Sequence, residues 1–242
     1  MRAGDWEFRN RAMIFGMIMG CTFPLYAVDH QNSAAALANW FGSESNMDPD
    51  TIARLIFSVA AALLALAALL RTWASAYLHA KVVYAAEVKT AALVADGPYR
   101  RVRNPLYFAN VLMAVAMGTL MSRSGAIIAI FAMWLFCYRL IRREEAELRV
   151  SQGERYEAYL RAVPRFWPSF RARIASAGTP ARWADGFKAE LWYWGFAASL
   201  ASFAATLKLK WFFIILTASI LLFWITTTIL NKKDNKKAVG SE

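Results

Sequence analysis

Residues 211–230 read WFFIILTASILLFWITTTIL, which is twenty residues without one charged side chain. A helix needs about 20 predominantly apolar residues to cross the hydrocarbon core of a bilayer, and this stretch has that length. Five more charge-free runs occur in the chain, at residues 12–28, 55–70, 104–122, 124–138 and 191–207. The sequence therefore predicts an all-α polytopic membrane protein with about six transmembrane helices.

The composition excludes several other classes of protein. Hydrophobic residues make up 58% of the 242 residues, which is too many for a disordered chain. Two cysteines cannot form a disulfide scaffold. The net charge of +11 is typical of nucleic-acid binding, but here the basic residues lie in blocks between apolar runs. We therefore expect a membrane partner and no nucleic acid.

The distribution of basic residues predicts the orientation, because Lys and Arg are enriched in cytoplasmic loops. With both termini inside, 24 basic residues lie on the cytoplasmic side and 4 on the other side. The loop 29–50 has four acidic residues and no basic one, so it is placed outside. The polar segments 71–106 and 139–190 then share the cytoplasmic face of a membrane, which we expect to be a bacterial inner membrane.

Three regions are expected along the chain. Residues 1–70 hold the first two membrane helices, and residues 71–168 form a core with the third and fourth membrane helices and an interfacial helix. Residues 169–242 hold a linker with Gly178-Thr179-Pro180, two more membrane helices and a Lys-rich tail at 232–237 that we expect to be disordered. The last two helices carry no chemical motif and are a candidate homo-oligomer contact.

The first polar segment ends in a turn rich in arginine. Gly97-Pro98 should end a helix through 73–94, because proline cannot continue a helix. Asn104-Pro105 should start the next helix, since asparagine is a strong N-cap and proline is favoured at the first helical position. Three arginines, at positions 100, 101 and 103, then lie below a helix N-terminus. This arrangement predicts an anion site, with lipid-phosphate anchoring as the alternative.

The second polar segment follows the fourth predicted span and places Glu144 and Glu145 at the membrane interface. Carboxylates at that depth need partners, and Arg149 could pair with Glu145 as an i,i+4 neighbour on one helix. A solvated, salt-bridged helix is one interpretation. The other is a site for a zwitterion, in which arginine binds the carboxylate and glutamate binds the ammonium group.

These motifs together resemble a known family. The ordered set is Gly97-Pro98-Tyr99-Arg100, Arg103-Asn104-Pro105-x-Tyr107, Glu144-Glu145-x-x-Leu148, Gly153-x-x-Tyr156-x-x-Tyr159 and Val163-Pro164-Arg165. It is similar to that of the isoprenylcysteine carboxyl methyltransferase and phospholipid methyltransferase group of membrane enzymes, over about residues 70–168. The resemblance implies S-adenosylmethionine as the cofactor and methyl transfer to a lipid or lipidated acceptor.

The resemblance also implies roles for individual residues. Glu144 and Glu145 would bind the methionyl ammonium group, and Arg165 would lie near the substrate entrance. Asn104 stands where most family members have histidine, which argues against proton transfer at that position. The residues expected to hold the cofactor are Tyr99, Arg103, Asn104, Pro105, Tyr107, Glu144 and Glu145, and those expected to be catalytic are Arg103, Glu145 and Arg165.

Two other functions fit the same sequence. Membrane sterol and steroid reductases, which use NADPH, share an Arg-x-Pro-x-Tyr turn, but this chain has Ala109-Asn110 where a Gly-Glu commonly follows in that group. A lipid-binding scaffold without catalysis is the second alternative. No cluster of histidine, cysteine and carboxylate residues has the spacing of metal ligands, so we expect no metal. The acceptor stays open between a carboxylate, which would be O-methylated, and an amine, which would be N-methylated.

Overall fold

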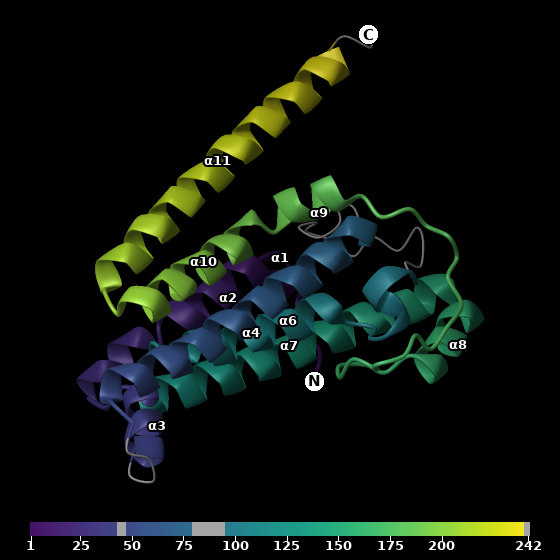
Figure 1. Ribbon diagram of the computed structural model, residues 1–242. Helices are drawn as coiled ribbons and strands as arrows, with labels where there is room; N and C mark the ends of the chain where they lie inside the picture. Colours follow the sequence, from purple (N-terminus) through teal and green to yellow (C-terminus); the bar gives the residue numbers. More distant parts are fainter. Residues whose placement is uncertain (43–46, 79–94, 240–242) are drawn as a thin grey trace.

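The computed structural model describes residues 1–42, 47–78 and 95–239 (Figure 1). These residues form helices and no β-strand, which confirms the predicted all-α class. In chain order the elements are α1 (Asp5–Arg9), α2 (Arg11–Gly20), η1 (Phe23–Ala27), α3 (Ser33–Gly42), α4 (Pro49–Leu78), η2 (Gly97–Arg100), α6 (Pro105–Gly118), α7 (Arg123–Gln152), α8 (Glu154–Ala162), α9 (Trp183–Ala189), α10 (Leu191–Thr206) and α11 (Leu209–Val239).

Three helices among the described residues are long and apolar enough to cross a membrane, namely α4, α7 and the part of α11 from Leu209 to Thr226. They contain the predicted spans 55–70 and 124–138 and most of 211–230. The other three predicted spans form shorter apolar helices, in Arg11–Ala27, in α6 and in the 16 residues of α10. The chain is therefore a membrane protein, and its described residues include three helices of full spanning length. Helix α4 also continues past residue 70, where the sequence places a domain boundary.

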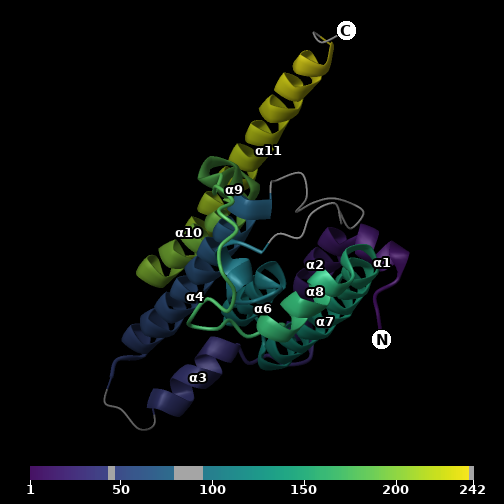
Figure 2. The same cartoon turned by 90° about the vertical axis from the view of Figure 1, so that its right-hand side faces the viewer.

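Helix α4 lies at the centre of the bundle, where α6, α9 and α10 pack against it. Its contact faces carry small side chains, and Ala60, Ala67 and Ala68 are buried with Leu64 in the main core. Small residues let helix backbones approach closely in a membrane protein. On the other side of α6, α7 packs against α6 and α2, and Figure 2 shows α1 and α2 beside α7.

Two tight connections join consecutive helices of the bundle. Helix α6 ends at Gly118 and α7 begins at Arg123, while α10 ends at Thr206 and α11 begins at Leu209. The Ser122 side chain caps α7 by accepting a hydrogen bond from the Gly125 amide at 3.2 Å. Short connections of this kind place consecutive helices side by side and antiparallel.

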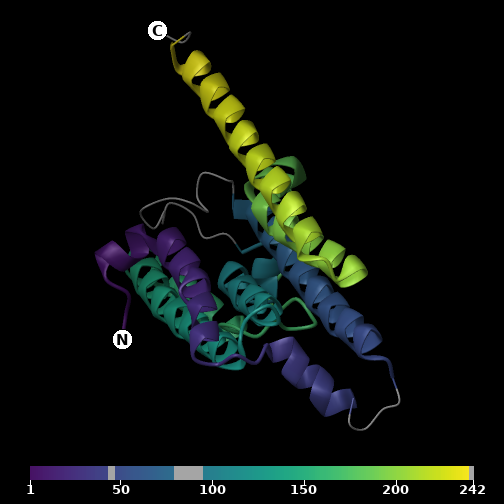
Figure 3. The same cartoon turned by 90° about the vertical axis from the view of Figure 1, so that its left-hand side faces the viewer.

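Helix α11 contacts α10 near its start and then diverges from the bundle (Figure 3). The close approach occurs at Gly195, where an added Cβ would lie 2.4 Å from the Cβ of Ser219. The tail at 232–237, which we expected to be disordered, continues α11 as helix. The reason is that no glycine or proline interrupts these residues before Gly240.

A buried ion pair ties the C-terminal helices to the rest of the bundle. The Arg71 Nε lies 2.5 Å from a carboxylate oxygen of Glu190, and the exposed fraction of the Glu190 side chain is zero. Arg71 also donates to the Asn110 side chain on α6 at 2.8 Å, and Ser75 donates to Glu190 at 2.6 Å. A charged group buried among apolar helices is stable only with partners of this kind. This network therefore fixes α4, α6 and the start of α10 relative to one another.

Residues 163–182, which we call the strap, connect α8 to α9 without regular structure (Figure 1). The strap is held by the buried carboxylate of Asp96. The Ser176 hydroxyl donates to this carboxylate at 2.7 Å, and the backbone amides of Ala177 and Thr179 donate at 3.0 and 2.9 Å. The hydrogen bond from Ser176, followed by those from Thr179 and Ala177, lowers the Asp96 pKa from 3.8 to about 2.

We predict that Glu190→Gln strongly destabilises the protein, by about 3–5 kcal/mol, because the Arg71 guanidinium then stays buried without its counter-charge. Thermal unfolding in detergent measures this loss. The matched control is Asp185→Asn on α9, because its 3.1 Å ion pair with Arg182 is solvent-exposed and should contribute at most about 1 kcal/mol. The double replacement of Arg71 and Glu190 by leucine should recover part of the stability. Equal effects of Glu190→Gln and Asp185→Asn would contradict this account.

We predict that the protection of the Ala177 and Thr179 amides from hydrogen exchange depends on the ionisation of Asp96. Folding lowers the Asp96 pKa from 3.8 to about 2. The ionised carboxylate therefore stabilises the strap fully when the pH is above the pKa of the unfolded chain. This stabilisation is lost as the pH falls through the pKa of the folded protein. Hydrogen exchange, corrected for intrinsic rates, should show this loss. In Asp96→Asn, protection near neutral pH should be low and should not fall further in acid; unchanged protection in that variant would refute the assignment.

Candidate functional site

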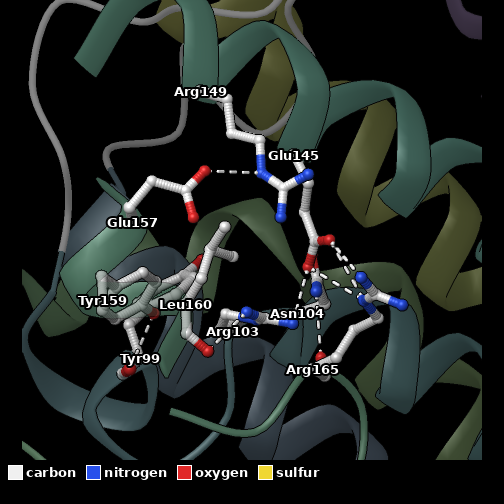
Figure 4. Close-up of polar contacts among 9 residues, drawn as sticks. All are labelled: Tyr99, Arg103, Asn104, Glu145, Arg149, Glu157, Tyr159, Leu160 and Arg165. Carbon is white, nitrogen blue, oxygen red and sulfur yellow. Dashed lines mark hydrogen bonds and ion pairs between the residues drawn. The ribbon is translucent and has the colours of Figure 1, made fainter. Parts of the chain in front are cut away.

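The two polar segments of the sequence meet at one end of the helix bundle. Glu145, on α7, lies 3.1 Å from Arg103 in the turn before α6 and 2.9 Å from Arg165 on the strap (Figure 4). The convergence of these segments on one face, predicted from the charge distribution, is therefore present in the structure. Of the residues expected to be catalytic, all three belong to this one cluster.

The turn before α6 forms as the sequence predicts. Gly97 has φ +59°, and an added Cβ would lie 2.4 Å from the ring of Tyr77, so glycine is needed for both backbone conformation and space. Pro98 is the second residue of the short helix η2, which begins at Gly97. Because α4 is described only to Leu78, the predicted helix through 73–94 lies in part outside the described residues.

Asn104 and Pro105 start α6, but the cap is made differently from our expectation. Asn104 occupies the N-cap position and Pro105 follows at the first helical position. The Asn104 side chain makes no capping hydrogen bond, and its amide instead donates to the backbone carbonyl of Arg165 at 2.9 Å (Figure 4). The reason is a tertiary partner, because the strap lies within reach of Asn104. This residue therefore joins the two segments of the site.

Helix α8 turns back from the end of α7 and packs its aromatic side chains on the first segment. Gly153, with φ +54°, separates α7 from α8. Tyr156 and Tyr159 are buried together with Val163. The Tyr159 hydroxyl donates to the backbone carbonyl of Tyr99 at 2.8 Å (Figure 4). Burial raises the pKa of both tyrosines, so their hydroxyl groups are neutral donors.

Glu145 is the central group of the cluster. Only 4% of Glu145 is exposed, and both of its carboxylate oxygens face guanidinium groups. The Arg103 side chain is 8% exposed, whereas that of Arg165 is 40% exposed, so Arg165 forms the outer edge. Burial lowers the pKa of Arg103, and the Glu145 charge opposes this shift. Two guanidinium groups around one carboxylate leave a net positive charge, which favours an anionic ligand.

Glu144 and Glu145 have different partners. The Tyr107 hydroxyl, on α6, donates to Glu144 at 2.6 Å. Successive residues on a helix point about 100° apart, so neighbouring carboxylates face different sides of α7. The expected pair of glutamates for one ammonium group is thus split in this structure into a carboxylate held by arginines and a carboxylate held by a tyrosine.

The predicted i,i+4 pair of Glu145 and Arg149 is wrong. Arg149 lies 3.0 Å from Glu157 on α8 (Figure 4), and the i,i+4 pair on α7 is that of Arg143 and Glu147, at 2.8 Å. The buried Glu145 instead takes the arginines that are buried with it or lie beside it. Helical spacing alone shows which residues are neighbours of Glu145 on α7, but it does not predict that Arg103 and Arg165 are its ion-pair partners.

Two polar atoms in the site are buried without a hydrogen-bond partner among the described residues. They are the Tyr99 hydroxyl and the Arg103 Nε. A buried polar group left unsatisfied costs roughly 1–3 kcal/mol. Burial also raises the Tyr99 pKa well above its usual value, so its hydroxyl stays protonated as a donor. Such atoms fit a polar ligand that would accept hydrogen bonds inside the site.

The N-terminal helix also contacts α7 beside the site, which was not predicted from the sequence. Glu7 on α1 lies 2.7 Å from Arg139, and Asp5 lies 2.8 Å from Arg143, so α1 packs on α7 one turn from Glu144. Phe8 is buried with Tyr107 in one apolar cluster. The acidic residues of α1 facing the basic residues of α7 were the signal that could have indicated this contact.

Comparisons with known proteins place the site in context. Residues 55–151 match the family model described as phospholipid methyltransferase. The chain is 28% identical over 133 residues to the cobalt-zinc-cadmium resistance protein CzcN of Cupriavidus metallidurans, and 28% identical over 125 residues to the nickel-cobalt-cadmium resistance protein NccN of Alcaligenes xylosoxydans xylosoxydans. These alignments cover 54% and 51% of this chain. No solved structure matches the chain significantly.

The family match covers residues 55–151 and leaves out both ends of the chain. The chain spans only 58% and 55% of the lengths of the two resistance proteins. The family match includes Arg103, Tyr107 and both glutamates but ends before Arg165. Residues 55–151, which carry the arginine turn and the two glutamates of α7, match the phospholipid methyltransferase family, and this confirms the resemblance to that group of membrane methyltransferases.

Proposed function

We propose that the protein transfers a methyl group from S-adenosylmethionine to a lipid or lipidated acceptor at the cytoplasmic membrane face. The observation that carries this proposal is the cluster of Arg103, Glu145 and Arg165, which joins the two motif segments at one end of the bundle. The family match to phospholipid methyltransferases supports the reaction type. The depth of the site, at the ends of apolar helices, favours an acceptor that stays in the bilayer.

The side chains of the site fit the charges of the proposed cofactor. Its methionyl part carries a carboxylate and an ammonium group. The buried Arg103 Nε has no partner in the described part of the chain, and Arg103 belongs to a cluster with excess positive charge, so it suits the carboxylate. Glu144, held by the neutral Tyr107 hydroxyl, suits the ammonium group. The Tyr99 hydroxyl, which no described residue contacts by a hydrogen bond, provides a further donor. Asn104 and Pro105 position these groups by starting α6.

S-adenosylmethionine supplies the activated methyl group, so the protein mainly has to orient the acceptor and exclude water. Arg165 is the partly exposed member of the cluster and would hold an anionic acceptor group at the edge of the site. A carboxylate acceptor needs no proton removal. An amine acceptor must lose a proton to a base beside it.

We predict that S-adenosylhomocysteine raises the unfolding temperature of the purified protein and that NADPH does not, because only a ligand that binds the folded state stabilises it. At a concentration a hundred times the dissociation constant, the gain is about 2.7 kcal/mol. Glu145→Gln and Arg103→Ala should remove this stabilisation, measured as the difference between each variant with and without the ligand. Glu157→Gln is the control, since its 3.0 Å pair with Arg149 is exposed.

The outcomes separate the three candidate functions. Stabilisation by NADPH alone would favour the reductase, and stabilisation by neither ligand would favour the scaffold. If both cluster variants kept the affinity for S-adenosylhomocysteine, the assignment of the site would be refuted.

We predict that Tyr99→Phe weakens the binding of S-adenosylhomocysteine several-fold without lowering the stability of the free protein. The hydroxyl has no partner among the described residues, so its removal relieves an unsatisfied buried group. Calorimetric titration and thermal unfolding measure the two effects. Tyr159→Phe is the comparison, because it removes the 2.8 Å bond to the Tyr99 carbonyl and should lower stability. A loss of stability in Tyr99→Phe without loss of affinity would show that the hydroxyl serves the fold alone.

The acceptor can be identified by incubating the protein with a membrane lipid extract and methyl-labelled cofactor, with products separated by mass. A label found only in water-soluble products would contradict a lipid acceptor. A methyl ester or a methylated amine in the product would decide between the two acceptor chemistries.

A further inference from the structure

We propose that the strap is a membrane-binding element, in which Trp167 and Phe170 insert into the leaflet at the site end of the bundle and Arg171 and Arg173 bind lipid phosphate groups. This proposal concerns the surface of the protein and does not depend on methyl transfer. It commits to one partner, the anionic lipid of that leaflet.

The apolar side chains of the strap are unusually exposed. Trp167 is 73% exposed and Phe170 is 98% exposed. Trp167 and Phe166 form edge-to-face contacts with each other and with Phe108 on α6, with ring centroids 5.4–5.7 Å apart. Phe108 and Phe166 thus hold the indole ring in place while most of its surface stays uncovered. Aromatic side chains of this kind are enriched where a membrane protein meets the headgroup region.

The contacts of the strap place these side chains at the depth of the bilayer surface. Phe108 lies in the first turn of α6, at the end of an apolar helix. The Ser169 amide donates to the Arg101 carbonyl at 2.9 Å, and the Arg173 amide donates to the Arg100 carbonyl at 2.8 Å. The strap is therefore fixed to the turn that begins α6. An exposed apolar group held at that level faces lipid rather than bulk water.

The charge of the strap complements an anionic lipid surface. Between Glu157 and Asp185 the chain has five arginines and no acidic residue. Two of these, Arg171 and Arg173, are exposed and follow directly after Phe170. Clustered arginines next to aromatic residues attract phosphate groups while the rings insert among the acyl chains. Because Arg165 begins the same strap, a lipid held there lies beside the outer edge of the site.

The test uses an environment-sensitive fluorescent label on the full-length protein in vesicles. The exposed Cys21 is replaced by alanine, and the buried Cys137 is kept. The label is attached to the new cysteine of Phe170→Cys in one variant and of Trp167→Cys in a second. The control position is Val150, which is 90% exposed and lies about 7.5 Å beyond Glu145 along α7.

In vesicles of phosphatidylcholine with phosphatidylglycerol, labels at 167 and 170 should emit at shorter wavelength than the label at 150. Spin-labelled acyl chains should quench the labels at 167 and 170 at least several-fold more strongly than the label at 150. Phosphatidylcholine alone, or Arg171→Gln with Arg173→Gln, should reduce that quenching. Equal quenching at 150 and 170 would overturn the insertion, and insensitivity to phosphatidylglycerol would overturn the phosphate contact. A blue-shifted label that acyl-chain probes do not quench would show a protein contact and would also overturn the proposal.

Discussion

The architecture of the site depends on the ion pairs that the Glu145 carboxylate forms with Arg103 and Arg165. This carboxylate is almost fully buried, and it lies between an arginine from the turn before α6 and an arginine from the strap. Removing such a carboxylate from water is costly unless both of its oxygens are paired. The pairing therefore brings together three segments of the chain, namely the turn before α6, α7 and the strap.

A second buried charge performs the same task for the C-terminal helices. The pair of Arg71 and Glu190 joins a helix inside the family match to a helix outside it, and Asn110 on α6 completes the contact. Asn110 lies one turn after Tyr107 on α6, so this network supports the helix that carries the partner of Glu144. The helices after the strap are thus structurally coupled to the candidate site, although they carry no residue of it.

Local features of the structure could be predicted from the sequence because short-range sterics decide them. Pro98 and Pro105 allow few backbone conformations, and Gly97 alone adopts its positive φ without strain. Runs of apolar residues fix where helices can cross a membrane. The shared face of the two polar segments followed from the asymmetry of charge between loops. Partner choice could not be predicted in this way. Asn104 and Glu145 both have good local partners by helix rules, yet both bond to the strap, because tertiary contacts satisfy a buried polar group better than an exposed neighbour does.

The partners of Glu144 and Glu145 decide how the two glutamates would share a zwitterionic ligand. The resemblance assigns the ammonium group to Glu144 and Glu145 alike. Both oxygens of Glu145 already face guanidinium groups, so an ammonium group there would meet two competing cations. A ligand carboxylate, in contrast, would balance the excess positive charge of the two arginines. Glu144 has a neutral hydroxyl as its partner and can accept a cation without displacing one. Under the proposed function, Glu145 would therefore position Arg103 for the cofactor carboxylate and Arg165 for the acceptor, and Glu144 would bind the ammonium group.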